Sequence, residues 1–185
     1  FLYRRTFNIP SDMNGKNILL HFGAVDWKCQ VYINGKQVGE HRGGFDPFFF
    51  DITSALDKSK KEQEIQVFVQ DYQEHGGYPH GKQKINEKVI WYTPVTGIWQ
   101  TVWLEAVSNI HIDKLVMNPD IDNRKISIKV VSEKAKTSTK VNLKIFDGKK
   151  LIASKNGVNA NENRDIQIPN QKLWSPEYPC LDDVK

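Results

Sequence analysis

Short runs of alternating apolar and polar residues, separated by turn-forming residues, make up most of this sequence. Residues 28–34 alternate strictly, with Cys29, Val31 and Ile33 on one side, which is the period of a half-buried β-strand. Asn34-Gly35 closes this run, and both residue types tolerate the positive φ that a two-residue hairpin turn needs. No helical pattern longer than one turn precedes residue 108. The chain is therefore predicted to be all-β, because short strands with turns between them build sandwiches or barrels.

A change in pattern near residue 108 divides the chain. Residues 1–107 are predicted to form one two-sheet β domain. Residues 108–185 are predicted to form a second β-sandwich, with a hairpin turn at Asp147-Gly148. The second range holds about five strand patterns, whereas an immunoglobulin-like sandwich needs ~7. We therefore expect the second domain to be incomplete at its C-terminus by one or two strands.

Composition excludes several classes of function. Hydrophobic residues make up 39% of the chain and charged residues 26%, which is ordinary for a soluble globular protein. No run of ~18 apolar residues is present, so no membrane span is predicted. The net charge of +4 falls after residue 108 on dispersed lysines, whereas a nucleic-acid surface clusters lysines among aromatic residues. No nucleic-acid partner is predicted.

The redox state and the cellular compartment stay open at this stage. Cys29 and Cys180 lie far apart in the sequence. Two unrelated thiols are favoured over a disulfide, because a chain of this length does not need a covalent link. Residues 1–9 read as a strand with Arg4 and Arg5 in its middle, so no secretory signal is visible. A bacterial-type parent that is periplasmic or secreted remains an alternative, and so does an oligomer.

The loop between residues 71 and 96 is the best candidate for a binding site. It is rich in Gly, Pro, His, Tyr and Trp, and it precedes a predicted strand over residues 97–107 that carries two tryptophans. Irregular loops on a rigid β scaffold often carry binding residues. Sugars bind to aromatic faces and to polar side chains that reach their hydroxyls. The candidate carbohydrate-binding residues are Asp71, Tyr78, Lys82, Gln83, Trp91 and Tyr92.

Packing is the alternative role for each of these side chains. Trp91 and Trp99 are predicted to pin the loop to the sandwich rather than to bind sugar. Trp27 is predicted to lie in the core, with neighbouring Asp26 satisfied by backbone donors. For Asp71, Lys82 and Gln83 the binding and the structural interpretations carry equal weight, and both remain open.

No catalytic, metal or cofactor site is predicted. His75 and His80 flank a turn, but a zinc site needs three or four ligands and no cysteine is near. Asn86-Glu87 and Asn161-Glu162 match a dipeptide found in glycosidases. Hydrolysis needs two facing carboxyls, about 5 Å apart in retaining enzymes, and neither dipeptide has an evident partner or follows a buried strand. Nucleophile-elbow and phosphate-loop patterns are missing from the sequence.

Several short motifs stand in a fixed order along the chain. They are Tyr3-Arg4-Arg5-Thr6-Phe7, Val31-Tyr32-Ile33-Asn34-Gly35-Lys36, Gly43-Gly44-Phe45-Asp46-Pro47-Phe48, Gly81-Lys82-Gln83, Ile90-Trp91-Tyr92-Thr93-Pro94, residues 97–105 and Leu173-Trp174-Ser175-Pro176. Each is weak alone, but the ordered set resembles the N-terminal part of glycoside hydrolase family 2, which contains β-galactosidases and β-glucuronidases. Two departures are Leu2, where an aromatic residue is usual, and Asp182, at a usual tyrosine position.

The resemblance implies a jelly-roll, sugar-binding-like domain over residues 1–107 and an immunoglobulin-like domain over residues 108–185. In the family, a (β/α)8 barrel follows and carries both catalytic glutamates. The resemblance places Asp71 and Gly81-Lys82-Gln83 in a loop at the rim of the active site. The predicted function is therefore a non-catalytic part of a β-galactosidase-like exo-glycosidase of carbohydrate metabolism, with a terminal β-glycoside and the missing barrel as partners. A free-standing carbohydrate-binding module and an adhesion sandwich are the alternatives.

Overall fold

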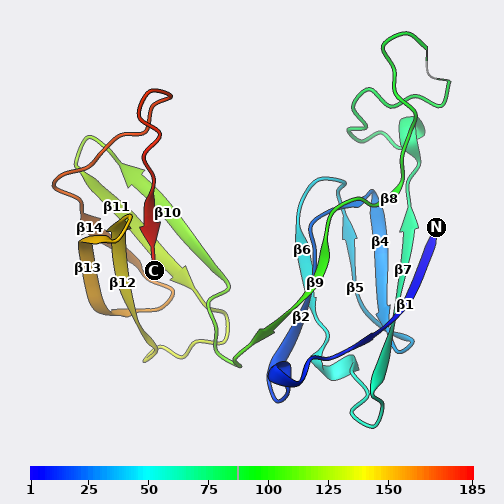
Figure 1. Cartoon of the computed structure of the whole chain (residues 1–185), viewed down its shortest axis with the longest axis horizontal. Coiled ribbons are helices and arrows are strands. Elements are labelled where there is room, and N and C mark those ends of the chain that lie inside the picture. The colour runs from blue at the N-terminus through cyan, green and yellow to red at the C-terminus, as the bar shows by residue number, and fades with distance from the viewer. Residues whose placement is uncertain (87) are drawn as a thin grey trace. The chain divides into compact units, whose positions relative to one another are not determined.

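The computed structural model describes residues 1–86 and 88–185, and nearly all of its regular structure is β (Figure 1). The chain separates into two compact units, Phe1–Ser108 and Asn109–Lys185. The prediction of an all-β fold is confirmed. Within the described residues the helical structure consists of three single 3₁₀ turns, at Ser11–Met13 (η1), Thr53–Ala55 (η2) and Gln73–His75 (η3).

The first unit is a sandwich of two antiparallel sheets. The four-stranded sheet has the order β1-β7-β4-β5, and the three-stranded sheet has the order β6-β2-β9. The strands of the first sheet are β1 (Leu2–Asn8), β7 (Glu62–Gln70), β4 (Lys28–Ile33) and β5 (Lys36–Arg42). Those of the second sheet are β6 (Phe48–Asp51), β2 (Asn17–Phe22) and β9 (Val102–Val107). A short pair, β3 (Val25–Asp26) with β8 (Gly97–Ile98), lies near the base of the 71–96 loop.

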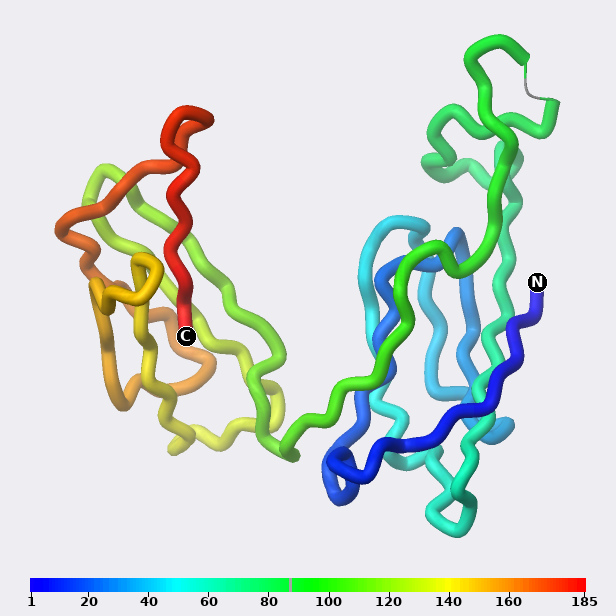
Figure 2. Tube along the Cα trace, viewed as in Figure 1, coloured from blue at the N-terminus to red at the C-terminus, as the bar shows by residue number. Residues whose placement is uncertain are grey.

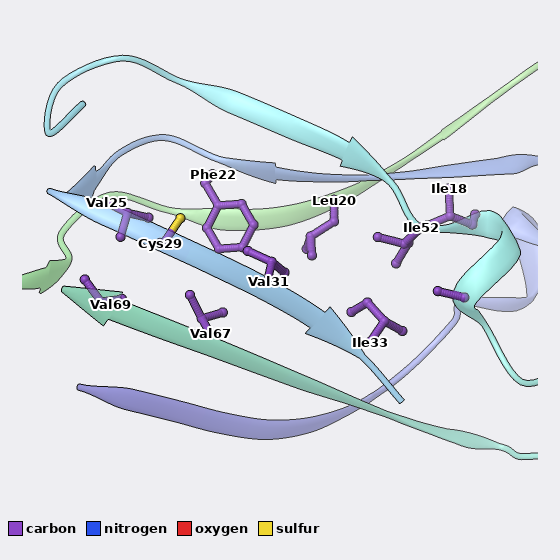
Figure 3. Close-up of a cluster of buried hydrophobic side chains, with 11 residues drawn as sticks. Ile18, Leu20, Phe22, Val25, Cys29, Val31, Ile33, Ile52, Val67 and Val69 are labelled. Carbon is purple, nitrogen blue, oxygen red and sulfur yellow. The ribbon is translucent and has the colours of Figure 1, made fainter. Parts of the chain in front are cut away.

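The core of the first unit comes from the alternating side chains of these strands. Cys29, Val31 and Ile33 of β4 are buried, as their spacing predicts, and they face Leu20 and Phe22 of β2 (Figure 3). The hairpin turn between β4 and β5 is the predicted one. Asn34 has φ 51° and Gly35 has φ 80°, as a turn with two left-handed residues requires.

Residues 53–56, which follow Asp51, have the sequence of a single capped helical turn, and the structure has such a turn there, η2. The Asp51 carboxylate accepts hydrogen bonds from the backbone N–H of Thr53 at 3.0 Å and from its hydroxyl at 2.5 Å. The hydroxyl oxygen of Thr53 in turn accepts the backbone N–H of Ile18 at 2.8 Å. The turn is therefore fixed to β2 by side-chain hydrogen bonds, in the manner of a helix cap.

The predicted strand over residues 97–107 is wrong as a single element. The structure has two strands here, β8 and β9, separated by residues 99–101. Residue Gly97 has φ +134°, and a Cβ atom there would lie 2.1 Å from the hydroxyl oxygen of Tyr3. The close approach of two chain segments needs glycine at this position. Trp99 consequently lies outside both strands, in the bend between the two sheets that they join.

The second unit contains two three-stranded sheets, β10-β11-β14 and β13-β12-β15. Their strands are β10 (Lys114–Asp120), β11 (Lys125–Val131), β14 (Asn163–Gln167), β13 (Lys150–Asn159), β12 (Lys140–Asp147) and β15 (Asp182–Val184). Ile128 and Val130 of β11 face Leu143 and Ile145 of β12 in a separate core.

The sequence pattern of the second unit predicts strands over residues 110–117 and 150–154, and both ranges need correction. The first strand begins at Lys114, and β13 continues to Asn159. An additional strand, β15, was not predicted. It lies beside β12, as the red end of the trace shows (Figure 2). Val184 is opposite Ile145 and packs on the core. Three residues are too few to show a period-2 pattern, so only the pairing partner reveals this strand.

Candidate functional site

The candidate site is the loop over residues 71–96, which joins β7 to β8 in the first unit. Figure 1 shows this loop, in green, extending past the ends of β4, β5 and β7. Apart from η3 it has no regular structure within its described residues. A loop of this length without its own core must be held by side-chain hydrogen bonds and ring contacts.

Asp71 makes the contacts that hold the base of the loop. Its Oδ1 atom accepts hydrogen bonds from the Tyr78 hydroxyl at 2.5 Å and from the backbone N–H of Gln73 at 2.8 Å. Its Oδ2 atom accepts the Thr96 hydroxyl at 2.9 Å. One carboxylate therefore connects the first, middle and last residues of the loop. Hydrogen bonds to a charged acceptor are the stronger kind.

Tyr78 is fixed from a second direction by Trp27, which lies between β3 and β4. The two rings stack with centroids 4.1 Å apart and an interplanar angle of 6°. The Tyr78 hydroxyl also accepts the backbone N–H of Tyr72 at 2.5 Å. Burial and the hydrogen bond to Asp71 raise the pKa of Tyr78 to about 12. This phenol is therefore a neutral donor at physiological pH.

The prediction that Trp27 lies in the core is wrong. The buried positions around it are taken by Val25 and Cys29, and the indole of Trp27 is half-buried against Tyr78. Asp26 was predicted to rely on backbone donors, but the side chain of Gln83 hydrogen-bonds to it. Burial, with the charge of Asp71 as a further cause, raises the pKa of the Asp26 carboxyl, and the Gln83 hydrogen bond opposes this.

Gln83 shapes the loop as well as contacting Asp26. Its Oε1 atom accepts the backbone N–H of Val95 at 2.6 Å. The neighbouring backbone forms a narrow ribbon, because the N–H of Tyr92 donates to the Lys82 carbonyl at 2.9 Å and the N–H of Lys84 donates to the Tyr92 carbonyl at 3.0 Å. The side chains of Lys82 and Tyr92 are exposed at this ribbon.

The two tryptophans expected to pack are exposed. Trp91 is 40% exposed and Trp99 is 50% exposed, so each side chain is partly covered by the protein and partly open to solvent, and the packing role stays a prediction. Lys84 lies 5.6 Å above the ring of Trp91 and pairs with Glu74 at 3.5 Å. The indole N–H of Trp99 donates to the Gly44 carbonyl at 2.7 Å. Both rings are oriented by one polar contact while a face remains accessible.

The six predicted site residues thus fall into two groups. Asp71, Tyr78 and Gln83 have buried or half-buried polar atoms and hold the loop. Lys82, Trp91 and Tyr92 are exposed on its outer part. Asp26, Trp27 and Thr96 were not predicted to contact the loop residues. Their contacts join segments far apart in the chain, and apart from one residue pair no local sequence pattern indicates them. The only local signal was an acidic-aromatic pair, Asp26-Trp27, between two short strand patterns.

The arrangement suits the binding of hydroxyl groups better than hydrolysis. Asp71 accepts three hydrogen bonds and Asp26 is bonded to Gln83, so neither carboxylate is placed as a free nucleophile facing an acid. Asn161 bonds the backbone of Ser132 through both amide atoms, at 2.9 Å each. Glu162 pairs with Arg164. Asn161-Glu162 therefore has a structural role, and Glu87 of the other dipeptide lies outside the described residues.

The described residues contain no group of three or more His, Cys, Asp and Glu side chains placed to hold a metal ion. His75 is exposed and His80 is half-buried in the 71–96 loop. Cys29 and Cys180 are both free thiols. Residues 1–86 and 88–185 contain no helix that is long and apolar enough to span a membrane.

The fold is all-β, with one long loop that projects from the first unit, and comparison with known proteins shows which family it resembles. Residues 1–91 match the family model described as glycosyl hydrolase 2 galactose-binding domain-like. The resemblance to the N-terminal part of glycoside hydrolase family 2 is therefore confirmed.

Named relatives agree with this family. The chain is 29% identical to a β-galactosidase of Thermoanaerobacter pseudethanolicus over 201 residues, which cover 98% of this chain and 25% of the relative. It is 27% identical to a β-glucuronidase of Formosa agariphila over 204 residues, which cover 97% of this chain and 20% of the relative. The chain thus spans between a fifth and a quarter of the length of these relatives.

Solved structures share the fold. The apo structure of a β-glucuronidase from Ruminococcus gnavus superposes with a TM-score of 0.77 at 21% identity, covering 99% of this chain and 32% of that chain. A β-glucuronidase from Dictyoglomus thermophilum gives a TM-score of 0.76 at 23% identity, covering 99% and 33%. At this level of identity the similarity establishes the β-sandwich architecture.

Proposed function

We propose that this chain is a non-catalytic part of a family 2 exo-glycosidase of the β-galactosidase type. In this proposal residues 1–107 form the jelly-roll, sugar-binding-like domain and residues 108–185 form the immunoglobulin-like domain. The (β/α)8 barrel with both catalytic glutamates lies outside these 185 residues. The length of the relatives supports this assignment, because the chain spans about a quarter of the β-galactosidase it resembles.

The observation that carries the proposal is the construction of the 71–96 loop. Its base is held by Asp71 and by the Trp27–Tyr78 stack, and its outer part exposes Trp91 and Tyr92. A loop with a fixed base and exposed aromatic faces can border a sugar cleft that another domain completes. In this role it restricts the cleft to terminal sugars and positions them for carboxylates of the barrel.

The loop residues would then take different parts in binding. Tyr92, which is 66% exposed, would pack its ring against the C–H surface of a sugar. The Lys82 ammonium would donate hydrogen bonds to sugar hydroxyls. Asp71, with three donors already bound, would set the position of the loop rather than contact the sugar. Asp71 is therefore a positioning residue in this proposal.

Hydrolysis assays test the non-catalytic assignment. The purified chain is expected to release no nitrophenol from 4-nitrophenyl β-galactoside or β-glucuronide, because the neighbouring carboxyls of Asp26 and Asp71 are already hydrogen-bonded within the protein. The control is the same preparation passed through a second purification step. Turnover that persists at constant specific activity through that step would refute the assignment.

Exposure of Trp91 and Tyr92 also favours a second candidate, a carbohydrate-binding module that works without a barrel. This candidate predicts heat of binding for galactosides, glucuronides or mannosides in isothermal titration of the chain alone. The signal should be lost in Tyr92→Ala and kept in Tyr32→Ala, whose ring lies on β4 against Phe68. Absence of heat with all three sugar classes would exclude it and leave the first proposal.

The reading frame around this segment distinguishes the two candidates independently of any binding assay. The exo-glycosidase proposal requires several hundred further codons with alternating strand and helix patterns. It also requires an Asn-Glu pair at the end of a predicted strand. A stop codon directly after Lys185, with no such region upstream, would contradict it.

A further inference from the structure

The sequence contains three Asn-Gly pairs, Asn14-Gly15, Asn34-Gly35 and Asn156-Gly157. In such a pair the backbone nitrogen of the glycine can attack the side-chain amide of the asparagine, because glycine has no Cβ atom to shield that nitrogen. The three pairs share this local chemistry and differ in what surrounds them. Their hydrogen bonds in the folded protein therefore decide which pair can react.

Asn34 is the most firmly held of the three asparagines. Its Nδ2 atom donates hydrogen bonds to the Ala55 carbonyl at 3.0 Å and to Gln63 Oε1 at 2.7 Å. Its Oδ1 atom accepts the backbone N–H of Glu64 at 3.0 Å. Gln63 is buried, so little water is available to replace these bonds when they open. Attack by the Gly35 nitrogen would require the amide to turn away from all three partners.

Asn156 lies within β13, and its pair is held through the glycine. The backbone N–H of Gly157, which is the attacking group, donates to Asn142 Oδ1 at 2.9 Å. The pair also lies between Lys155 and Val158, which are both paired with β12. Attack therefore requires a side-chain hydrogen bond to break and the strand pairing to loosen.

Asn14 and Gly15 form a turn between η1 and β2. Asn14 has φ −59° and ψ 138°, and Gly15 has φ 76°. The N–H of Lys16 donates to the Met13 carbonyl at 3.3 Å. These values define a type II turn, whose third residue needs the positive φ that glycine accepts. Both residues of the pair are exposed, and among residues 1–86 and 88–185 the Asn14 side chain and the Gly15 N–H have no hydrogen-bond partner.

Reaction at Asn14 requires only this turn to rearrange. The backbone must rotate about ψ of Asn14 to bring the Gly15 nitrogen onto the side-chain carbon. The hydrogen bond of the turn, at 3.3 Å, is longer than the ~2.9 Å typical of such bonds and opens readily. A Cβ atom built on Gly15 would meet no atom within 4 Å, so the rotation meets no obstacle.

We propose that Asn14 is a site of spontaneous deamidation in the folded protein. Hydroxide removes the proton of the Gly15 backbone nitrogen, and that nitrogen bonds to Cγ of Asn14. The Cγ–Nδ2 bond breaks, water returns a proton to the departing nitrogen, and ammonia leaves a succinimide ring behind. Water then opens the ring at either carbonyl and gives aspartate or isoaspartate. The net reaction consumes water and releases ammonia, and this inference does not rest on the proposed glycosidase role.

The product changes both the charge and the backbone just before β2. Either product places a carboxylate beside Lys16. Isoaspartate also lengthens the backbone by one methylene between Met13, which packs on the core, and Ile18, which is buried. We therefore expect the isoaspartate form to melt at a lower temperature than the Asn14→Asp variant, which has the same charge and an ordinary backbone.

The test incubates the full chain at pH 8 and follows amide-to-acid conversion at each pair by peptide mapping and mass spectrometry. Short acetylated, amidated peptides with the same local sequences give the rate of each pair without the fold. Each hydrogen bond that must open slows the reaction by about fivefold. We expect Asn14 to react within about threefold of its peptide, Asn156 to be slower than its peptide by more than about tenfold, and Asn34 by more than about a hundredfold.

Two variants make the test specific to the hydrogen bonds described. Asn142→Ala removes the acceptor of the Gly157 N–H and should speed conversion at Asn156 by about fivefold, with the rate at Asn14 unchanged. Gly15→Ala shields the attacking nitrogen and should suppress conversion at Asn14 alone. Circular dichroism and thermal melting establish that each variant is folded.

The proposal is wrong if Asn14 keeps its amide while Asn156 loses it, because the turn would then be better protected than the strand. Equal rates at all three pairs would also contradict it, since conversion would then proceed through global unfolding. A rate at Asn14 that does not rise with pH would overturn the mechanism, because hydroxide removes the first proton.

Discussion

Replacing Tyr78 by phenylalanine removes one hydroxyl from the base of the 71–96 loop and leaves the ring available to stack on Trp27. That hydroxyl donates to the Asp71 carboxylate at 2.5 Å and accepts the backbone N–H of Tyr72 at 2.5 Å. A hydrogen bond to a charged group contributes about 1.5–3 kcal/mol net, and a neutral one about 0.5–1.5 kcal/mol. Water can reach part of this site, because Tyr72 is exposed. The expected loss of stability therefore lies near the lower end of the sum of these two ranges.

We therefore expect Tyr78→Phe to cost about 2 kcal/mol of local stability, equivalent to about thirtyfold in the equilibrium for opening the loop. Native-state hydrogen exchange measures this directly. Protection of the amides of Tyr72 and Gln73 should fall by about that factor. The amides of Val31 and Val67, in the sandwich core, should keep their protection.

Tyr92→Phe is the matched control, because the Tyr92 ring is 66% exposed and its side chain does not hold the loop base. It should leave exchange at Tyr72 and Gln73 unchanged. The reasoning fails if Tyr78→Phe leaves the loop amides equally protected, since Asp71 would then hold the loop without the phenol. It fails also if core amides lose protection by the same factor, since the effect would then be global.

Three further predictions concern stability and reactivity. Asp26→Asn should raise the melting temperature at pH 7 but not at pH 3. Burial raises the pKa of the Asp26 carboxyl, so this group stabilises the fold below its pKa in the unfolded chain, and that stabilisation is lost as pH rises through its pKa in the folded protein. An equal gain in melting temperature at both pH values would contradict this. Phe22→Ala should lower the free energy of unfolding of the first unit by about 3–5 kcal/mol, because Phe22 is fully buried; a denaturant midpoint close to wild type would show that the core repacks. Cys180 should react with a thiol reagent at pH 8 and Cys29 only after unfolding, because burial raises the pKa of the Cys29 thiol to about 11; equal rates in the native protein would disprove this.

The sequence predicted local structure well where one period covered a whole element. Residues 28–34 showed the alternation of β4, and Asn34-Gly35 marked its turn. Prediction failed where a strand has too few residues to show an alternating pattern. The bend at residues 99–101 splits one expected strand, and β15 has three residues. In both cases the pairing with a distant strand, which no local pattern encodes, decides the structure.

For the candidate site, the sequence indicated a segment but not the contacts within it. The concentration of aromatic and polar residues after position 71 indicated which segment to examine. It did not indicate that Asp71 holds the loop while Tyr92 is exposed. Likewise, the motif containing Arg4 and Arg5 gave no sign that Arg4 pairs with Glu64 while Arg5 lies opposite Ile65 on the other face of the strand.

The sequence alone determined that this chain is all-β and that a long loop rich in aromatic and polar residues interrupts its strands after position 71. Those properties follow from hydrophobic period and turn chemistry, which act over a few neighbouring residues. Only the tertiary structure decided that Trp27 stacks on Tyr78 and that Gln83 reaches Asp26. Each of these contacts joins residues far apart in the chain, and its existence depends on how the sheets pack rather than on any local preference.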